Sequence, residues 1–218
     1  PPATDLFGAD GADPAAVRAL APLPETVDEV CAVAAALGAG NDALRLGAAA
    51  NENEIKALSA NGALEQAAVV HFATHGLISG DLTGLAEPAI VLTPPETASS
   101  ANDGLLTASE VAALKFNADW VILSACNTAS GEGGGEALSG LARAFFYAGA
   151  RSLMVSHWPV NSDAAVSLVT KTVSEMANDK STSRPEALRR AMLAEIVRGG
   201  AHAEPENWAP FVLVGDGG

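Results

Sequence analysis

The sequence predicts an α/β fold in which helices cover both faces of a largely parallel β-sheet. Three short runs, at residues 67–74, 120–124 and 152–156, are almost continuously apolar and rich in β-branched residues. Strands with this pattern are buried on both faces, as in parallel sheets. Helical segments lie between these runs and no linker-like stretch divides them. We therefore expect a single domain over residues 17–218, preceded by a loose lead-in over residues 1–16.

The elements before the first buried strand are delimited mainly by capping signals. Thr26 and Glu29 have the spacing of a capping box, which predicts a helix start. Asn51 and Glu54 have a similar spacing and predict a second start. The expected elements here are a strand at 17–20, a helix at 26–38, a short strand at 43–46 and a helix at 51–61.

The later elements carry similar signals. Thr107 and Glu110 form another capping-box pattern, and Ser162 is expected to cap a long helix. Pro185 stands where the first turn of a helix tolerates proline. The expected elements are a short strand at 89–92, helices at 107–114, 136–148, 162–177 and 185–198, and a last strand at 211–214.

The composition argues against several functional classes. The net charge is −14, from 26 acidic and 12 basic residues, and the chain lacks the basic stripe of a nucleic-acid binder. No apolar run reaches the roughly 18 residues of a membrane-spanning helix. Two cysteines are too few for a disulfide framework, so we expect a reducing, cytoplasmic setting. The chain begins without methionine or a signal segment, and we expect it to be a piece of a longer protein.

Polar side chains that can perform chemistry follow the buried strands. His75, Cys126 and His157 each come directly after one of them, at the sheet edge where open α/β folds bind ligands. If the first two strands are neighbours, about 5 Å apart, an imidazole and a thiol project from adjacent loops. Such a pair can generate a thiolate nucleophile and protonate a leaving amine. The backbone N–H groups of Gly76 and Cys126 are candidate oxyanion donors.

Other interpretations of these residues stay open. Free cysteine is often buried, so Cys126 fits a structural thiol equally well, and Cys31, within an alanine-rich helix, is expected to be one. His71 lies inside a strand, about 13 Å from His75 if the strand is straight, so the two do not form a helical zinc pair. No metal site and no cofactor are expected. The glycine-rich loop at residues 131–136 lacks the lysine and hydroxyl of a phosphate-binding loop, which disfavours nucleotide binding.

Several short motifs resemble the CHAT domain family when they are taken together and in order. They cover most of the chain from about residue 20. The stronger ones are HFATHG at 71–76, LSACNT at 123–128, GEALSGLARAF at 135–145, AGARS at 148–152 and WPV at 158–160, and the weaker ones are PLPET at 22–26, DGLLT at 103–107 and residues 208–215.

This resemblance implies a caspase-like three-layer αβα sandwich with a mostly parallel central sheet, related to caspases and separase. It implies that His75 and Cys126 form a catalytic dyad. The chain would then be a cysteine endopeptidase that cleaves protein substrates at selected sites through a thioester intermediate. Such domains often follow tetratricopeptide repeats in bacterial proteins, so regulatory repeats are expected in the full-length protein. A catalytically silent caspase-like module for protein interaction is the alternative.

The chain departs from the family pattern in one place. After the WPV motif the family commonly has two acidic residues, whereas this chain has Asn161, Ser162 and Asp163. Separase-like relatives use acidic groups here to recognise basic side chains. Asp163 is therefore a candidate substrate-binding residue, or simply an acidic residue in a first helical turn. Trp158 is a candidate wall of the specificity pocket, or a core residue.

Overall fold

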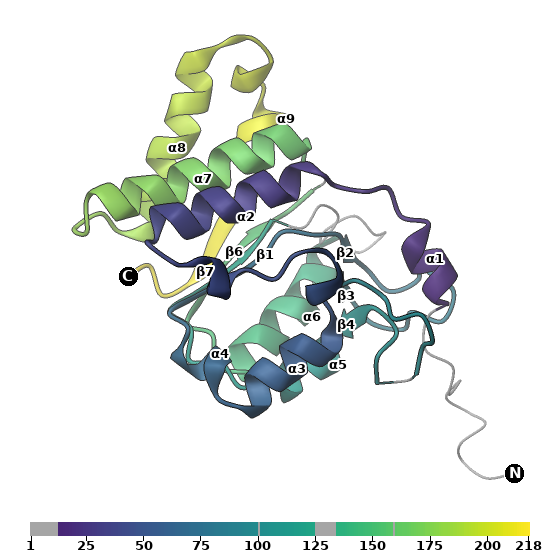
Figure 1. The fold of residues 1–218 in the computed structure, drawn as a ribbon. Coiled ribbons are helices and arrows are strands. Elements are labelled where there is room, and N and C mark those ends of the chain that lie inside the picture. The colour runs from purple at the N-terminus through teal and green to yellow at the C-terminus, as the bar shows by residue number, and fades with distance from the viewer. Residues whose placement is uncertain (1–12, 100, 125–133, 159) are drawn as a thin grey trace, which may run out of the picture.

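The computed structural model describes residues 13–99, 101–124, 134–158 and 160–218, the side chains of residues 134–139 excepted. Its main sheet has the strand order β1-β5-β6-β7. The strands are β1 (Val69–Phe72), β5 (Trp120–Leu123), β6 (Ser152–Ser156) and β7 (Phe211–Gly215). The first three are parallel and β7 is antiparallel to β6. The expected mixed α/β fold with a mostly parallel sheet is confirmed (Figure 1).

Helices cover both faces of this sheet. One face carries α2 (Glu25–Ala36), α7 (Ser162–Asn178) and α8 (Arg184–Arg198), and the other carries α3 (Glu52–Ala60), α5 (Ala108–Ala113) and α6 (Gly134–Tyr147) (Figure 1). Side chains of β5 alternate between the two cores. Trp120 and Ile122 pack on the α2 side, whereas Val121 and Leu123 pack on the α3 side. Each buried side chain of this size contributes about 1.5–3 kcal/mol to folding, which fixes the register of β5.

A smaller antiparallel sheet lies beside the carboxyl end of β1. It consists of β2 (Gly76–Leu77), β3 (Ala89–Val91) and β4 (Leu105–Thr107), in that order. Val17 of helix α1 (Pro14–Arg18) packs against its apolar side chains. The remaining described helices are short: α4 (Ala63–Gln66), α9 (Pro205–Trp208) and the 3-10 turns Asn41–Ala43, Gly47–Ala49 and Gly200–Ala203.

Two of the predicted caps are confirmed. The side chain of Asn51 accepts a hydrogen bond of 3.0 Å from the backbone N–H of Glu54 at the start of α3. Thr107 and Glu110 form the reciprocal capping box at the start of α5. These caps satisfy backbone donors that a helix leaves without partners at its first turn.

Two predicted strands are wrong. Residues 17–20 begin inside helix α1, because Asp13 accepts a hydrogen bond from Ala15 N–H and Pro14 opens the first turn. Residues 43–46 begin with the last residue of a 3-10 turn and pair with no strand among the described residues. Both runs are too short for periodicity to distinguish a strand from a turn of helix.

Two predicted caps are also wrong. Helix α2 begins at Glu25 with Pro24 at the cap position, and the Thr26 hydroxyl donates to the carbonyl oxygen of Leu23 at 2.7 Å. Helix α7 is capped by Asn161, not Ser162: the Asn161 side chain accepts from the first backbone N–H groups of the helix. In α2, the carboxylate expected to complete the box has a different partner, on strand β1.

Within the described part of the chain, no helix is both long and apolar enough to cross a membrane.

Candidate active site

The two strands that precede the predicted dyad are neighbours in the sheet. Phe72 of β1 pairs with Leu123 of β5, and the backbone N–H of Ser124 donates to the Phe72 carbonyl at 3.1 Å. His75 follows Phe72 by three residues, and Cys126 follows Leu123 by three. The condition on which the dyad depends, that the two strands are neighbours, is therefore met. Cys126 lies outside the described residues, and the dyad contact remains a prediction. Of the glycine-rich loop predicted at residues 131–136, residues 131–133 also lie outside them, and residues 134–136 belong to helix α6.

His75 is held by the main chain of a distant segment. Its Nε2 atom lies 2.6 Å from the carbonyl oxygen of Ala21, which precedes helix α2. Because a carbonyl oxygen only accepts hydrogen bonds, this contact places a hydrogen on Nε2 and leaves Nδ1 as the nitrogen that can take up a proton. Sequence reasoning missed Ala21, since a backbone carbonyl has no side-chain signature. Pro22 is the one local signal, because proline favours an extended residue before it.

Gly76 presents its backbone N–H away from strand β3. The Val91 N–H donates to the His75 carbonyl at 2.9 Å, so the polar backbone groups of His75 face β3. In an antiparallel ladder these directions alternate, and Gly76, opposite Ile90, belongs to a pair that exchanges no hydrogen bonds. The orientation is compatible with the predicted oxyanion role, which the structure leaves untested.

His71 belongs to a buried polar cluster that the sequence did not reveal. Its Nε2 atom lies 2.8 Å from Oε1 of Glu29 and 3.0 Å from Oγ of Ser124. The side chains of His71 and Glu29 are 8% and 2% exposed. Glu29 comes from helix α2, 42 residues away in sequence, so residue spacing could not have indicated the pair. We call these three residues the Glu29 cluster.

A largely apolar cavity of about 670 Å³ borders this part of the molecule. Helix α2, residues 42–47 and strand β1 line it, and both His71 and His75 are among its lining residues. Its volume lies in the usual range for pockets that bind small molecules or side chains.

The candidate specificity residues lie after strand β6. Trp158 is 38% exposed, and its Nε1 donates to the carbonyl oxygen of Glu206 at 3.3 Å. The ring of His157 stacks on it, with 6.5 Å between ring centroids. Asp163 is exposed in the first turn of α7. Trp158 thus lies at the surface, outside the three apolar core clusters.

Cys31 is exposed, and its expected burial in the core is wrong. The buried positions of helix α2 are Glu29 and Val33. Cys31 lies two residues from each of them. Two residues of an α-helix correspond to a rotation of about 200°, so the Cys31 side chain points to the opposite side of the helix from Glu29 and Val33. The residues next to Cys31 in the sequence are apolar, but alanine is tolerated on both faces of a helix. These neighbours therefore do not indicate whether Cys31 is buried.

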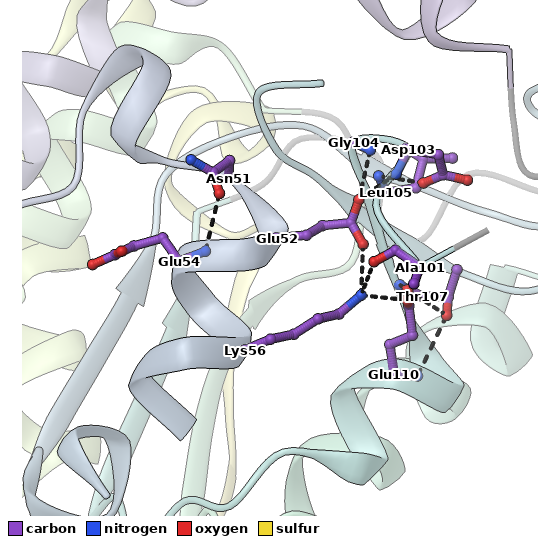
Figure 2. A network of polar contacts seen from close by, with 10 residues as sticks. All are labelled: Asn51, Glu52, Glu54, Lys56, Ala101, Asp103, Gly104, Leu105, Thr107 and Glu110. Atoms are coloured by element: carbon purple, nitrogen blue, oxygen red, sulfur yellow. Dashed lines mark hydrogen bonds and ion pairs between the residues drawn. The ribbon is translucent and has the colours of Figure 1, made fainter. Parts of the chain in front are cut away.

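A second buried polar network anchors the small sheet that contains Gly76 (Figure 2). Glu52 of α3 accepts hydrogen bonds from the backbone N–H groups of Asp103 and Gly104, at 2.7 and 2.6 Å, just before β4. Lys56 donates to Glu52 at 2.9 Å and to Glu110 at 2.7 Å. We call these residues the Glu52 network.

The two ends of the Glu52 network differ in exposure. The Glu52 side chain is 1% exposed, and burial raises the pKa of this carboxyl above its ordinary value, although the Lys56 hydrogen bond opposes the rise. Lys56 is 30% exposed. Burial lowers the pKa of Lys56, but its hydrogen bonds to Glu110 and Glu52 outweigh this effect and leave the pKa raised.

Among the described residues, no group of three or more His, Cys, Asp and Glu side chains is arranged to hold a metal ion.

Comparison with known proteins agrees with the motifs of the sequence. The family model described as CHAT domain matches residues 6–216. Tetratricopeptide repeat protein 28 from Mus musculus is 31% identical, over 70% of this chain and 7% of the relative. The protein of the same name from Homo sapiens is 32% identical, with the same coverage. The chain therefore corresponds to a small part of these relatives. With a family match over nearly its whole length, the chain belongs to the CHAT domain family.

Proposed function

We propose that this domain is a cysteine endopeptidase in which Cys126 is the nucleophile and His75 its acid–base partner. The observation that carries the proposal is the pairing of β1 with β5. In the sequence, each of the two residues comes three positions after one member of a strand pair, and the Ala21 carbonyl accepts a hydrogen bond from His75. Membership of the CHAT family, which is caspase-like, supports the same assignment.

The chemistry follows from the orientation of His75. Nδ1 takes the thiol proton of Cys126, because Nε2 donates to the Ala21 carbonyl. The sulfur attacks the carbonyl carbon of the scissile peptide bond, and the N–H groups of Gly76 and Cys126 stabilise the oxyanion. His75 then protonates the leaving amine, which leaves a thioester. Water, deprotonated by His75, hydrolyses this thioester and regenerates the thiol.

The substrates we propose are proteins cleaved at selected sites. Trp158 and Asp163 both follow strand β6 in the sequence and both are accessible, and an indole and a carboxylate are each groups that can contact a basic side chain. On this basis we expect lysine or arginine before the cut, and a weaker preference in the Asp163→Asn variant.

Regulation by tetratricopeptide repeats is part of the proposal. The two relatives are named for such repeats, and this chain matches only 7% of their length. We propose that the full-length protein contains similar repeats outside these 218 residues, and that they control access to the site.

The test is to incubate the domain with a diverse peptide library and to identify cleavage sites by mass spectrometry. Cys126→Ala should abolish cleavage, and His75→Ala should lower kcat by about 10³-fold, both with an unchanged circular dichroism spectrum. Cleavage that persists in purified Cys126→Ala would contradict the nucleophile assignment. A folded parent that cleaves nothing, even when joined to its repeats, would instead favour the silent interaction module.

A further inference from the structure

The Glu29 cluster interrupts an otherwise apolar layer between the main sheet and helix α2. Val69 of β1 and the β5 residues Trp120 and Ile122 pack in this layer. The next residues on the same strand faces, towards the carboxyl ends, are His71 and Ser124. The apolar layer therefore ends in polar side chains at the edge of the sheet where the candidate dyad begins.

The hydrogen bonds of the cluster restrict the His71 ring. A carboxylate oxygen accepts hydrogen bonds, so in the 2.8 Å contact to Glu29 the Nε2–H group of His71 is the donor. The Ser124 oxygen lies 3.0 Å from the same nitrogen, and its hydroxyl reaches the Phe72 carbonyl at 3.4 Å. The Nδ1 atom of His71 is buried and has no partner among the described residues. Among the described residues, the side-chain hydrogen bonds that orient the ring are therefore those to Glu29 and Ser124.

One segment, residues 21–29, contacts both His71 in β1 and His75 in the loop that follows β1. The Ala21 carbonyl accepts a hydrogen bond from His75, and Glu29, at a buried position of α2, contacts His71. Ser124 ties the same cluster to β5, two residues before Cys126. The cluster thus links helix α2 to both strands that precede the candidate dyad in the sequence.

Stability alone is a poor explanation for this arrangement. Burying a carboxylate and an imidazole carries a desolvation cost that their attraction often only balances. Apolar side chains of similar volume would fill the layer at least as well, as Trp120 and Ile122 do on the same face. What a polar cluster adds is a fixed relative geometry of the groups that it joins.

We infer that Glu29, His71 and Ser124 are positioning residues that hold the ends of β1 and β5 in the alignment which Cys126 and His75 need. This inference rests on the proposed function, but it concerns the geometry of the dyad and not the identity of the substrate. Displacements of about 1 Å in a reacting pair can lower rates by about 100-fold, so a supporting cluster has a measurable effect.

The experiment measures Cys126 directly in a Cys31→Ser background, because exposed Cys31 would also react. The rate of alkylation by iodoacetamide is recorded from pH 5 to 9 for Glu29→Gln, Ser124→Ala and the matched control Asp28→Asn, an exposed carboxylate on the same helix. Peptide cleavage is measured in parallel. We expect Glu29→Gln to lower alkylation at pH 7 and kcat at least 10-fold, with KM within twofold, and Asp28→Asn to match the parent. His71→Gln, which keeps a donor, should retain more activity than His71→Ala.

The outcomes separate this inference from the peptidase proposal. Glu29→Gln and Ser124→Ala profiles that match Asp28→Asn would overturn the positioning role, even if the melting temperature falls. The parent could cleave no peptide while its Cys126 still reacts with iodoacetamide. If alkylation then falls in Glu29→Gln and Ser124→Ala, the positioning role is supported although the peptidase proposal fails. A parent whose Cys126 reacts only after denaturation would overturn both. Ser124→Ala removes one hydroxyl, so it keeps the test decisive if Glu29→Gln does not fold.

Discussion

Among the buried carboxylates of the described residues, Glu29 on α2 and Glu52 on α3 lie on opposite faces of the main sheet and have different kinds of partner. Glu52 accepts from two backbone N–H groups just before β4 and from the ammonium group of Lys56. Glu29 contacts an imidazole on the strand that leads to His75. A carboxylate bound to backbone amides fixes the path of a loop, whereas one bound to an imidazole fixes the orientation of a side chain.

The positions of the two sites agree with this difference. The Glu52 network closes the loop before β4 onto α3, and Gly104 adds a constraint of its own. Its φ is 95°, and a Cβ at this position would collide with Pro94. The Glu29 cluster instead lies where the two strands of the candidate dyad end. We therefore expect damage to the Glu52 network to lower stability, and damage to the Glu29 cluster to lower reactivity.

Glu52→Ala should give the largest loss of stability. It leaves two buried N–H groups and part of the Lys56 ammonium without their acceptor, and we expect the free energy of unfolding to fall by about 3 kcal/mol. Urea denaturation followed by circular dichroism measures this change. The matched control is Glu54→Gln, which removes a charge that is 35% exposed and paired with Arg45, and should cost less than about 1 kcal/mol. Equal losses in the two variants would break the distinction between a buried anchor and a surface ion pair.

The sequence predicted best where the relevant forces are local. The run at 120–124 predicts a buried strand from its own side chains, and the Thr107–Glu110 cap is confirmed because both of its groups lie within one turn. The same spacing at Thr26 and Glu29 predicted a cap that does not form, because Glu29 has a partner 42 residues away. The fold class therefore followed from the sequence pattern, whereas the pairing of β1 with β5 and the contacts of His71 and His75 required the folded chain.

The pH dependence of stability offers a sharper test of the Glu52 network. Burial raises the pKa of Glu52 in the folded state above its ordinary value of 4.5. A raised pKa means that the folded state binds the proton more tightly, so the contribution of this group is fully present below about pH 4.5 and is lost as the pH rises through the folded value. The stability of the parent relative to Glu52→Gln should therefore decrease between pH 4.5 and 7, as measured by urea denaturation at each pH. A difference that stays constant or increases over this range would show that hydrogen bonds outweigh burial at Glu52.

The smallest effect is expected at Cys31, on the same helix as Glu29 but on its exposed face. Cys31→Ser should change the free energy of unfolding by less than about 0.5 kcal/mol, because surface substitutions disturb no packing. A thiol reagent should modify Cys31 in the folded parent, and peptide mapping by mass spectrometry distinguishes this modification from that of Cys126. Protection of Cys31 until unfolding would contradict its exposure and place a second copy of the chain over this face of α2. Helix α2 would then have two partners. Its Glu29 face would contact the sheet, and its Cys31 face would contact a protein surface.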